Sequence, residues 1–208
     1  TSYDQISKIK MKYLEFTDVE IHELKSEIIG ETFEILVKQP DPQILSLFGN
    51  KPLPVVYGTD ANLSAGGYIN TLEGLLLGGE IPPVLFIGIR YKLGDEPDFM
   101  QFVTSRTREF TPTEDAENQK LMEQMTLREV KGGGAENFLK FLTTELRDWV
   151  SERFNVSDDT TYIGDSMGGL FGLYTLFTEP RAFKRYVIGS PWQEWNHPTT
   201  FELEESYA

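Results

Sequence analysis

The chain has 208 residues, of which 33 are acidic and 19 are basic, and its net charge at pH 7 is −14. This charge excludes nucleic acid and anionic membranes as the main partners, because both are bound by basic surfaces. The absence of cysteine excludes disulfide bonds and thiolate metal sites, and it leaves the redox compartment open. The length and the 39% hydrophobic content predict a single domain over residues 1–208 with a well-buried core.

The N-terminal stretch T-S-Y-D-Q-I-S-K-I-K lacks the apolar region of a signal peptide. No apolar run approaches the ~18 residues of a membrane helix. We therefore expect no membrane partner and a cytoplasmic location. A periplasmic or secreted protein that has lost its signal would have the same sequence pattern.

Two alternating segments come first, Val19–Lys25 and Thr32–Val37, and the turn signal between them predicts an antiparallel hairpin. His22 lies in the first of these strands, where we expect a lone histidine to be a surface or sheet-edge residue. The prolines between residues 40 and 54 predict a loop.

Continuous apolar runs at 54–58 and 83–89 then indicate buried strands, and the run at 186–191 predicts another strand of the parallel type. Helix-length segments at 63–77 and 135–154 alternate with them, and the second has an apolar stripe at helical spacing: Phe138, Leu142, Leu146, Trp149 and Val150. This alternation predicts an α/β fold, with a mostly parallel sheet, helices on both faces and the N-terminal hairpin at one side.

Residues 91–131 are polar and charged, and we expect them to be the least regular part of the chain, either functional or mobile. Arg106 and Arg108 lie within this segment. Both arginines can contact a substrate, or they can form ion pairs with neighbouring acids such as Glu109 and Asp115.

The most informative stretch is T-Y-I-G-D-S-M-G-G-L-F-G-L-Y-T-L-F at 161–177. A short apolar strand, a tight turn with Ser166 at its apex and an apolar helix form the pattern of a nucleophile elbow. Gly164 and Gly168 remove side chains that would collide with the neighbouring backbone. The helix that follows directs its first amides toward the serine, so the Met167 N–H is placed to stabilise an oxyanion.

A blander interpretation also fits the turn, since a serine at this position can simply cap the helix. The bare G-x-S-x-G pattern is weak in a chain with 18 glycines, and it is the strand and helix around it that favour the elbow. A dinucleotide-binding turn is disfavoured because G-x-G-x-x-G is absent here.

Four blocks of sequence carry a family resemblance. They are V-V-Y-G-T-D-A-N-L at 55–63, R-T-R-E-F-T-P-T at 106–113, G-G-G-A-E-N-F-L-K-F-L at 132–142 and T-T-Y-I-G-D-S-M-G-G-L-F-G-L-Y at 160–174, the last followed by I-G-S-P-W-Q-E-W at 188–195. From about residue 19 onward the chain resembles the "Putative esterase" family of α/β-hydrolases. This family includes esterase D (S-formylglutathione hydrolase), feruloyl and acetylxylan esterases, mycolyltransferases and bacterial siderophore trilactone hydrolases. The order and spacing of the blocks are most similar to the trilactone hydrolase branch.

The resemblance implies a role for particular residues. Ser166 corresponds to the nucleophile and Met167 to one arm of the oxyanion hole. The second arm falls at Asn62, with Ala61 as its neighbour, although the family has glycine where this chain has Ala61. Further positions that correspond to the substrate-binding region are Asp60, Arg106, Trp192 and Trp195, and the two tryptophans fit a packing role equally well.

The resemblance also implies a small-molecule ester as substrate, with no metal and no organic cofactor. The reaction is then ester hydrolysis through an acyl-enzyme, on small esters or siderophore-type trilactones. A catalytically silent binding or scaffold domain on the same fold is the alternative, because a fold alone does not establish a chemistry. The sequence does not reveal an oligomeric state.

A catalytic histidine is missing from its usual place. In this fold the acid and the histidine follow the nucleophile, and the histidine lies beyond the last strand. His197 is the one histidine after Ser166, and it follows by only 31 positions. Three explanations are open: the fold is C-terminally incomplete in residues 1–208, His197 serves as the base in a rearranged site, or the domain is not catalytic.

Overall fold

The structure, a computed structural model, describes residues 18–93 and 98–207, so the N-terminal stretch discussed above lies outside the described residues. The strands are β1 (Val19–Lys25), β2 (Thr32–Lys38), β3 (Leu53–Gly58), β4 (Leu85–Tyr91), β5 (Val156–Asp165) and β6 (Arg185–Gly189). The helices are α2 (Pro42–Leu47), α3 (Ala61–Leu77), α4 (Phe99–Phe110), α5 (Ala116–Thr126), α6 (Ala135–Phe141), α7 (Arg147–Arg153), α8 (Met167–Thr178) and α9 (His197–Tyr207), with a π-helical turn, η1 (Leu142–Leu146), between α6 and α7.

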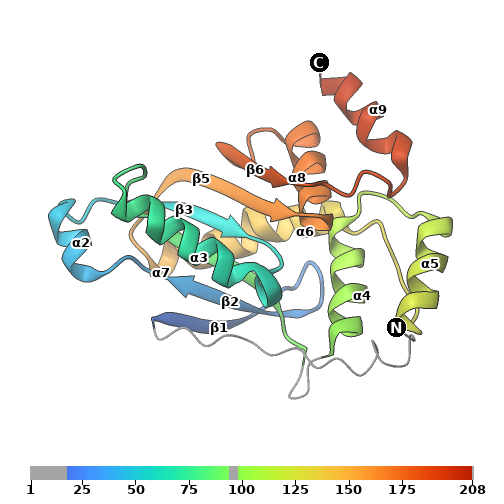
Figure 1. The fold of residues 1–208 in the computed structure, drawn as a ribbon, viewed down its shortest axis with the longest axis horizontal. Coiled ribbons are helices and arrows are strands. Elements are labelled where there is room, and N and C mark those ends of the chain that lie inside the picture. The colour runs from blue at the N-terminus through green and yellow to red at the C-terminus, as the bar shows by residue number, and fades with distance from the viewer. Residues whose placement is uncertain (1–17, 94–97, 208) are drawn as a thin grey trace.

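These strands form one sheet in the order β1-β2-β4-β3-β5-β6 (Figure 1). The strands β1, β2 and β4 pair antiparallel, whereas β4, β3, β5 and β6 run parallel to one another. The predicted hairpin and the mostly parallel sheet are therefore confirmed. Because the parallel strands end at the same edge, the segments that follow β3, β4 and β5 lie together there.

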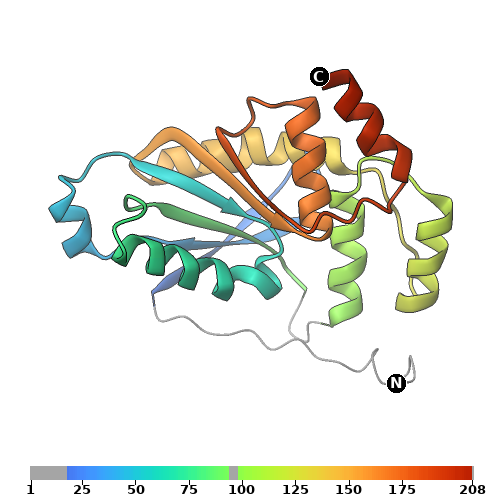
Figure 2. The same cartoon turned by 45° about the horizontal axis from the view of Figure 1, so that its top comes forward.

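Helices cover both faces of the sheet (Figures 1 and 2). On one face α3 packs through Ala61, Ala65 and Ile69 against strand residues such as Val56 and Phe86. On the other face, the larger core joins α4, α6 and α8 to the alternate strand residues. Successive strand residues point to opposite faces, so a strand covered on both sides is apolar throughout. This explains the continuous apolar runs in the sequence.

The helical stripe predicted at 135–154 lies in the larger core. Phe138, Leu142, Leu146 and Val150 are fully buried, and Trp149 packs partly buried at its edge. The segment is divided by η1, whose extra residue per turn shifts the helix register.

The predicted irregularity of residues 91–131 is wrong, because α4 and α5 occupy most of the segment. Aspartates begin both helices. Asp98 accepts a hydrogen bond from the amide of Gln101, and Asp115 accepts from the amides of Glu117 and Asn118. The proline-rich loop likewise contains α2, capped by Asp41. In the described ranges, no helix combines the length and the apolar character that a membrane crossing requires.

Candidate active site

Ser166 occupies the turn between the end of β5 and the start of α8. Its backbone lies at φ 58°, ψ −117°, in the positive-φ region that a residue with a Cβ rarely adopts. Three backbone hydrogen bonds hold this strained turn. The Ser166 N–H donates to the Gly189 carbonyl at 3.0 Å, and the Ser166 carbonyl accepts from the amides of Leu170 and Trp192, each at 3.0 Å.

The glycines on either side of the serine leave room for close backbone contacts. A Cβ at Gly164 would collide with the Tyr162 hydroxyl and would lie 2.6 Å from the Gly168 carbonyl oxygen. A Cβ at Gly168 would lie 2.7 Å from Oγ1 of Thr59. Both distances are shorter than carbon–oxygen contacts allow, so the turn requires glycine at both positions.

A buried tyrosine below the turn was not identified from the sequence. The Tyr162 hydroxyl donates to the Gly168 carbonyl at 2.6 Å and lies 3.1 Å from Oγ1 of Thr59. Burial raises the pKa of Tyr162 well above its usual 10, so the hydroxyl stays protonated as a donor. Tyr162 therefore ties the first turn of α8 to β5 beneath Ser166.

The Ser166 side chain does not cap α8, so the capping interpretation is wrong. Among the described residues its hydroxyl forms no hydrogen bond to another side chain. The amide of Met167 lies in the first helical turn, where an N–H has no intrahelical acceptor, and it donates to no described residue. The Met167 side chain is buried, and Oγ1 of Thr107 lies 3.6 Å from its sulfur.

The start of α3 lies beside the start of α8. Asp60, the residue before α3, is buried, and its Oδ2 would lie 3.3 Å from a Cβ at Gly168. Ala61 and Asn62 form the first turn of α3 and are both buried. The Asn62 side chain is hydrogen-bonded to the backbone of Tyr91 at the end of β4, so its amide group anchors α3 to the sheet.

Arg106 and Arg108 were predicted either to contact a substrate or to form ion pairs, and both form ion pairs. Arg106 donates from Nε and Nη2 to the two carboxylate oxygens of Asp60, at 2.8 and 2.5 Å. Arg108 pairs with the buried Glu109, as the sequence suggested, and also with Glu31. The partner of Arg106 is more than 40 positions away and could not be chosen from the sequence.

The two tryptophans differ in position. Trp192 is partly buried against the core, and its amide is bonded to the Ser166 carbonyl. Trp195 is fully buried, donates from its indole to the Thr113 carbonyl and packs on Gly132, where a Cβ would lie 2.6 Å from the ring. Trp195 is thus a packing residue, and of the two only Trp192 lies at the site.

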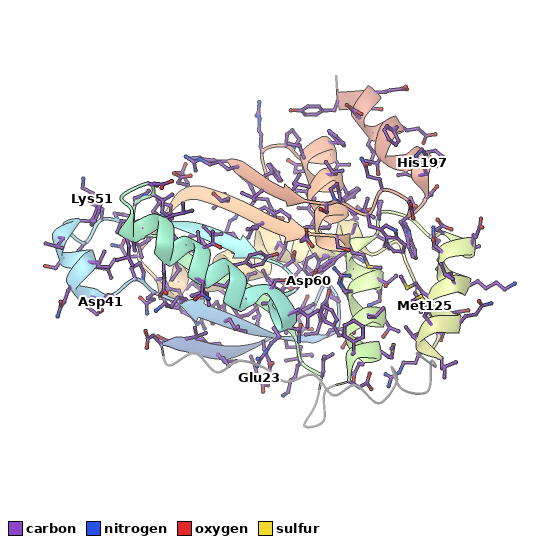
Figure 3. All side chains as sticks on the ribbon, in the orientation of Figure 1. Glu23, Asp41, Lys51, Asp60, Met125 and His197 are labelled. Atoms are coloured by element: carbon purple, nitrogen blue, oxygen red, sulfur yellow. The ribbon has the colours of Figure 1, made fainter. Side chains whose placement is uncertain are left out.

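Neither histidine lies at Ser166. His22 is on the edge strand β1 and packs against Trp149, as expected for a sheet-edge residue. Four strand spacings, roughly 19 Å, separate β1 from β5. His197 begins α9, is exposed and packs its ring on Phe201 with centroids 5.0 Å apart. Figure 3 shows it well away from Asp60, the labelled residue beside the elbow.

A shallow hollow of about 500 Å³ lies next to the turn, on the α3 side of the sheet. Its walls include Leu63, Tyr68 and Val187, and its floor reaches Gly164 and Asp165. Another hollow, of about 280 Å³, lies between α2 and the end of α3 at the opposite edge of the sheet and contacts none of the site residues. The described residues contain no group of three or more His, Asp or Glu side chains placed to hold a metal ion.

A six-stranded, mostly parallel sheet with a strained serine turn between strand and helix defines an α/β-hydrolase-type fold, and the turn has the backbone geometry expected of a nucleophile elbow. The family model described as "Putative esterase" matches residues 26–206. The chain therefore belongs to this esterase family.

Several relatives and solved structures are similar to the chain. "Ferri-bacillibactin esterase BesA" of Bacillus subtilis (strain 168) is 34% identical over 164 residues, which cover 74% of this chain and 53% of the relative. "Siderophore triacetylfusarinine C esterase" of Aspergillus fumigatus is 29% identical and covers 80% of this chain and 53% of its own length. The crystal structure of the BES protein from Bacillus cereus superposes with a TM-score of 0.74 at 25% identity, over 96% of this chain and 71% of that chain. The chain thus spans about half the length of the curated relatives it matches.

Proposed function

We propose that the protein containing this chain is a serine carboxylic-ester hydrolase, acting through an acyl-enzyme on small esters or siderophore-type trilactones. The observation that carries the proposal is the backbone of Ser166, held at positive φ between the end of β5 and the N-terminus of α8. Family membership supports ester hydrolysis. The names of two relatives, which are esterases of ferri-bacillibactin and of triacetylfusarinine C, support the siderophore class.

In the proposed reaction, the Ser166 oxygen attacks the ester carbonyl while a base takes its proton. The amides of Met167 and Asn62, or of Ala61 next to it, hold the negative oxygen of the tetrahedral intermediate. The base then returns the proton to the departing alcohol, which leaves an acyl group on the serine. A water molecule, deprotonated by the same base, attacks the acyl group and releases the acid. These steps require no metal and no organic cofactor.

We place the base outside residues 1–208. A catalytic base must come within about 3 Å of the serine oxygen, directly or through one water. His22 lies across the sheet, and the ring of His197 is exposed against Phe201. The second explanation, a rearranged site with His197 as the base, requires α9 to move.

Fluorophosphonate labelling tests both the nucleophile and the position of the base. We expect Ser166 to be labelled in the natural full-length protein, with residues 1–208 labelled far more slowly and Ser166→Ala not labelled at all. Equal labelling of the two lengths would contradict an external base. If His197→Ala then abolished that labelling, His197 would be the base.

A non-catalytic binding or scaffold domain is the second candidate, and the lack of a histidine beside Ser166 among the described residues favours it. Hydrolysis of p-nitrophenyl acetate and butyrate by the full-length protein and by Ser166→Ala separates the two functions. A rate that does not depend on Ser166 would support the second candidate.

A further inference from the structure

A buried ion pair adjoins the elbow and has no direct role in the proposed reaction. The side chains of Asp60 and Arg106 are only 6% and 14% exposed. Two guanidinium nitrogens of Arg106 donate to the two carboxylate oxygens of Asp60. Their position between α3, α4 and the first turn of α8 places the pair within contact distance of Gly168. Removing two charges from water is unfavourable, so such a pair needs a compensating role or excellent geometry.

The helix α4 holds the guanidinium in place. Phe102 and Phe110 lie one turn before and one turn after Arg106, and their ring centroids are 5.5 and 5.7 Å from its central carbon. Residues four apart share one helix face, so both rings flank the same side chain. Both phenylalanines are fully buried. Arg106 therefore presents its charge to Asp60 from a fixed position.

Asp60 differs from the other aspartates that begin helices. Asp41, Asp98 and Asp115 each have negative φ, and each accepts hydrogen bonds from the amides of the helix it begins. Asp60 has φ 55° and ψ 31°, and its carboxylate makes no such bond to α3. A capping aspartate normally satisfies first-turn amides. At α3 the carboxylate is turned to Arg106 instead.

We infer that Arg106 is a positioning residue for the oxyanion site, acting through its pair with Asp60, and this inference rests on the proposed function. Arg106 holds the Asp60 carboxylate away from the first-turn amides of α3. It also neutralises a negative charge next to the place where the negative oxygen forms. Without Arg106, the carboxylate would cap those amides and repel the transition state.

Steady-state kinetics of the natural full-length protein with p-nitrophenyl butyrate tests the inference. We expect Arg106→Gln to lower kcat by roughly 10²–10³-fold, the loss caused by removing one oxyanion donor. KM should change little, because the uncharged ester carbonyl depends less on these amides than the transition state does. Arg106→Lys keeps the charge but loses the two-pronged geometry, so its kcat should be intermediate.

The double variant Asp60→Asn/Arg106→Gln makes the test specific. If Arg106 acts by controlling the Asp60 carboxylate, removal of that carboxylate should restore kcat at least about tenfold over Arg106→Gln. If Arg106 binds the substrate directly, the double variant should be as slow as the single variant or slower. That second result, or a rise in KM with kcat unchanged, would overturn the inference.

Arg108→Gln is the matched control, because Arg108 lies on the same helix and pairs with another buried carboxylate, that of Glu109. It should lower the urea midpoint without a specific loss of kcat. Urea midpoints of all variants show whether each variant folds. If Arg106→Gln does not fold, Arg106→Lys and the double variant supply the test.

Undiminished hydrolysis by Ser166→Ala would instead reject the proposed function. An inactive Ser166→Ala with full kcat in Arg106→Gln would reject only the positioning role.

Discussion

At the scale of single residues, the glycines around Ser166 are the positions where the fold tolerates least change. Gly164→Ala would place a Cβ against the Tyr162 hydroxyl and 2.6 Å from the Gly168 carbonyl. We expect a loss of roughly 1–3 kcal/mol of stability, as for an overpacked core, together with slower fluorophosphonate labelling of Ser166 in the full-length protein. Urea denaturation and the labelling rate measure the two effects.

Gly74→Ala is a suitable control for that change. Gly74 is exposed within α3, and nothing lies within 4 Å of a Cβ built there. Alanine should stabilise the helix by about 0.5–1 kcal/mol and leave the labelling rate unchanged. If Gly164→Ala were as stable and as reactive as Gly74→Ala, the close contacts beneath the elbow would not constrain it.

Glu109 is a residue whose ionisation should make stability depend on pH. Its side chain is 2% exposed, one carboxylate oxygen has no hydrogen-bond partner among the described residues, and burial raises its pKa to about 7 despite the charge of Arg108. Between the unfolded pKa of 4.5 and about 7, the folded state binds more protons than the unfolded state. Stability from this group is therefore fully present below pH 4.5 and is lost as the pH rises through 7.

Glu109→Gln, which is neutral at every pH, tests this. The free energy of unfolding of the natural protein relative to the variant should increase by up to roughly 3 kcal/mol as the pH falls from above 7 to below 5. Urea denaturation at several pH values measures the difference, and contributions from other carboxylates cancel in it. A difference that stays constant with pH would show that Glu109 has an ordinary pKa.

At the scale of elements, the helices and strands with a local sequence pattern were predictable. The helices whose main signal is a capping residue were missed. The strands β3 and β4 and the helices α3 and α8 follow from apolar runs, with Gly78 at the end of α3 and Pro180 just beyond the end of α8. In α4, Arg106 and Arg108 interrupt the apolar positions, and two of their partners, Asp60 and Glu31, are distant in the chain, so the sequence pattern did not indicate a helix. The aspartates before α4 and α5, Asp98 and Asp115, are typical helix N-caps and could have indicated both helices.

Asp115 should contribute more than an ordinary cap. Its carboxylate accepts from the amides of Glu117 and Asn118, and also from the amide of Asn196 in the segment after β6 at 2.7 Å. Asp115→Ala should therefore cost about 1–2 kcal/mol, the upper range for a helix cap. Asp41→Ala, which removes a single bond at α2, should cost less. Equal losses in urea denaturation would show that the bond to Asn196 contributes nothing.

At the scale of the whole molecule, the sequence predicted the layers but not the contacts among distant blocks. The blocks at 106–113, 132–142 and 188–195 meet through backbone bonds such as Gly134 to Arg108 and through the packing of Trp195 on Gly132. Such contacts exist only after the chain has folded, so they leave no periodic signal. The strained turn at Ser166 was predictable because its sequence pattern is local, whereas the Asp60–Arg106 pair and the Tyr162 support were not.

The net charge of −14 predicts how the folded chain responds to salt. Excess like charge destabilises a compact state through repulsion, and salt screens it as the Debye length falls from ~30 Å at 0.01 M to ~8 Å at 0.15 M. Exposed pairs such as Lys25–Glu27 weaken at the same time, but each contributes at most about 1 kcal/mol. We expect a net gain of about 1 kcal/mol, which raises Tm by about 2–4 °C over this range.

The double variant Glu204→Lys/Glu205→Lys, which reverses the charge of two exposed residues on α9, tests the cause of that salt response. Each change adds two positive charges, so the net charge moves from −14 to −10. Fewer excess negative charges leave less repulsion to screen, so the variant should gain less from salt than the natural chain in thermal scans. A Tm that falls with salt, or an identical salt response in the variant, would mean that local ion pairs and not overall repulsion determine the electrostatic stability of this fold.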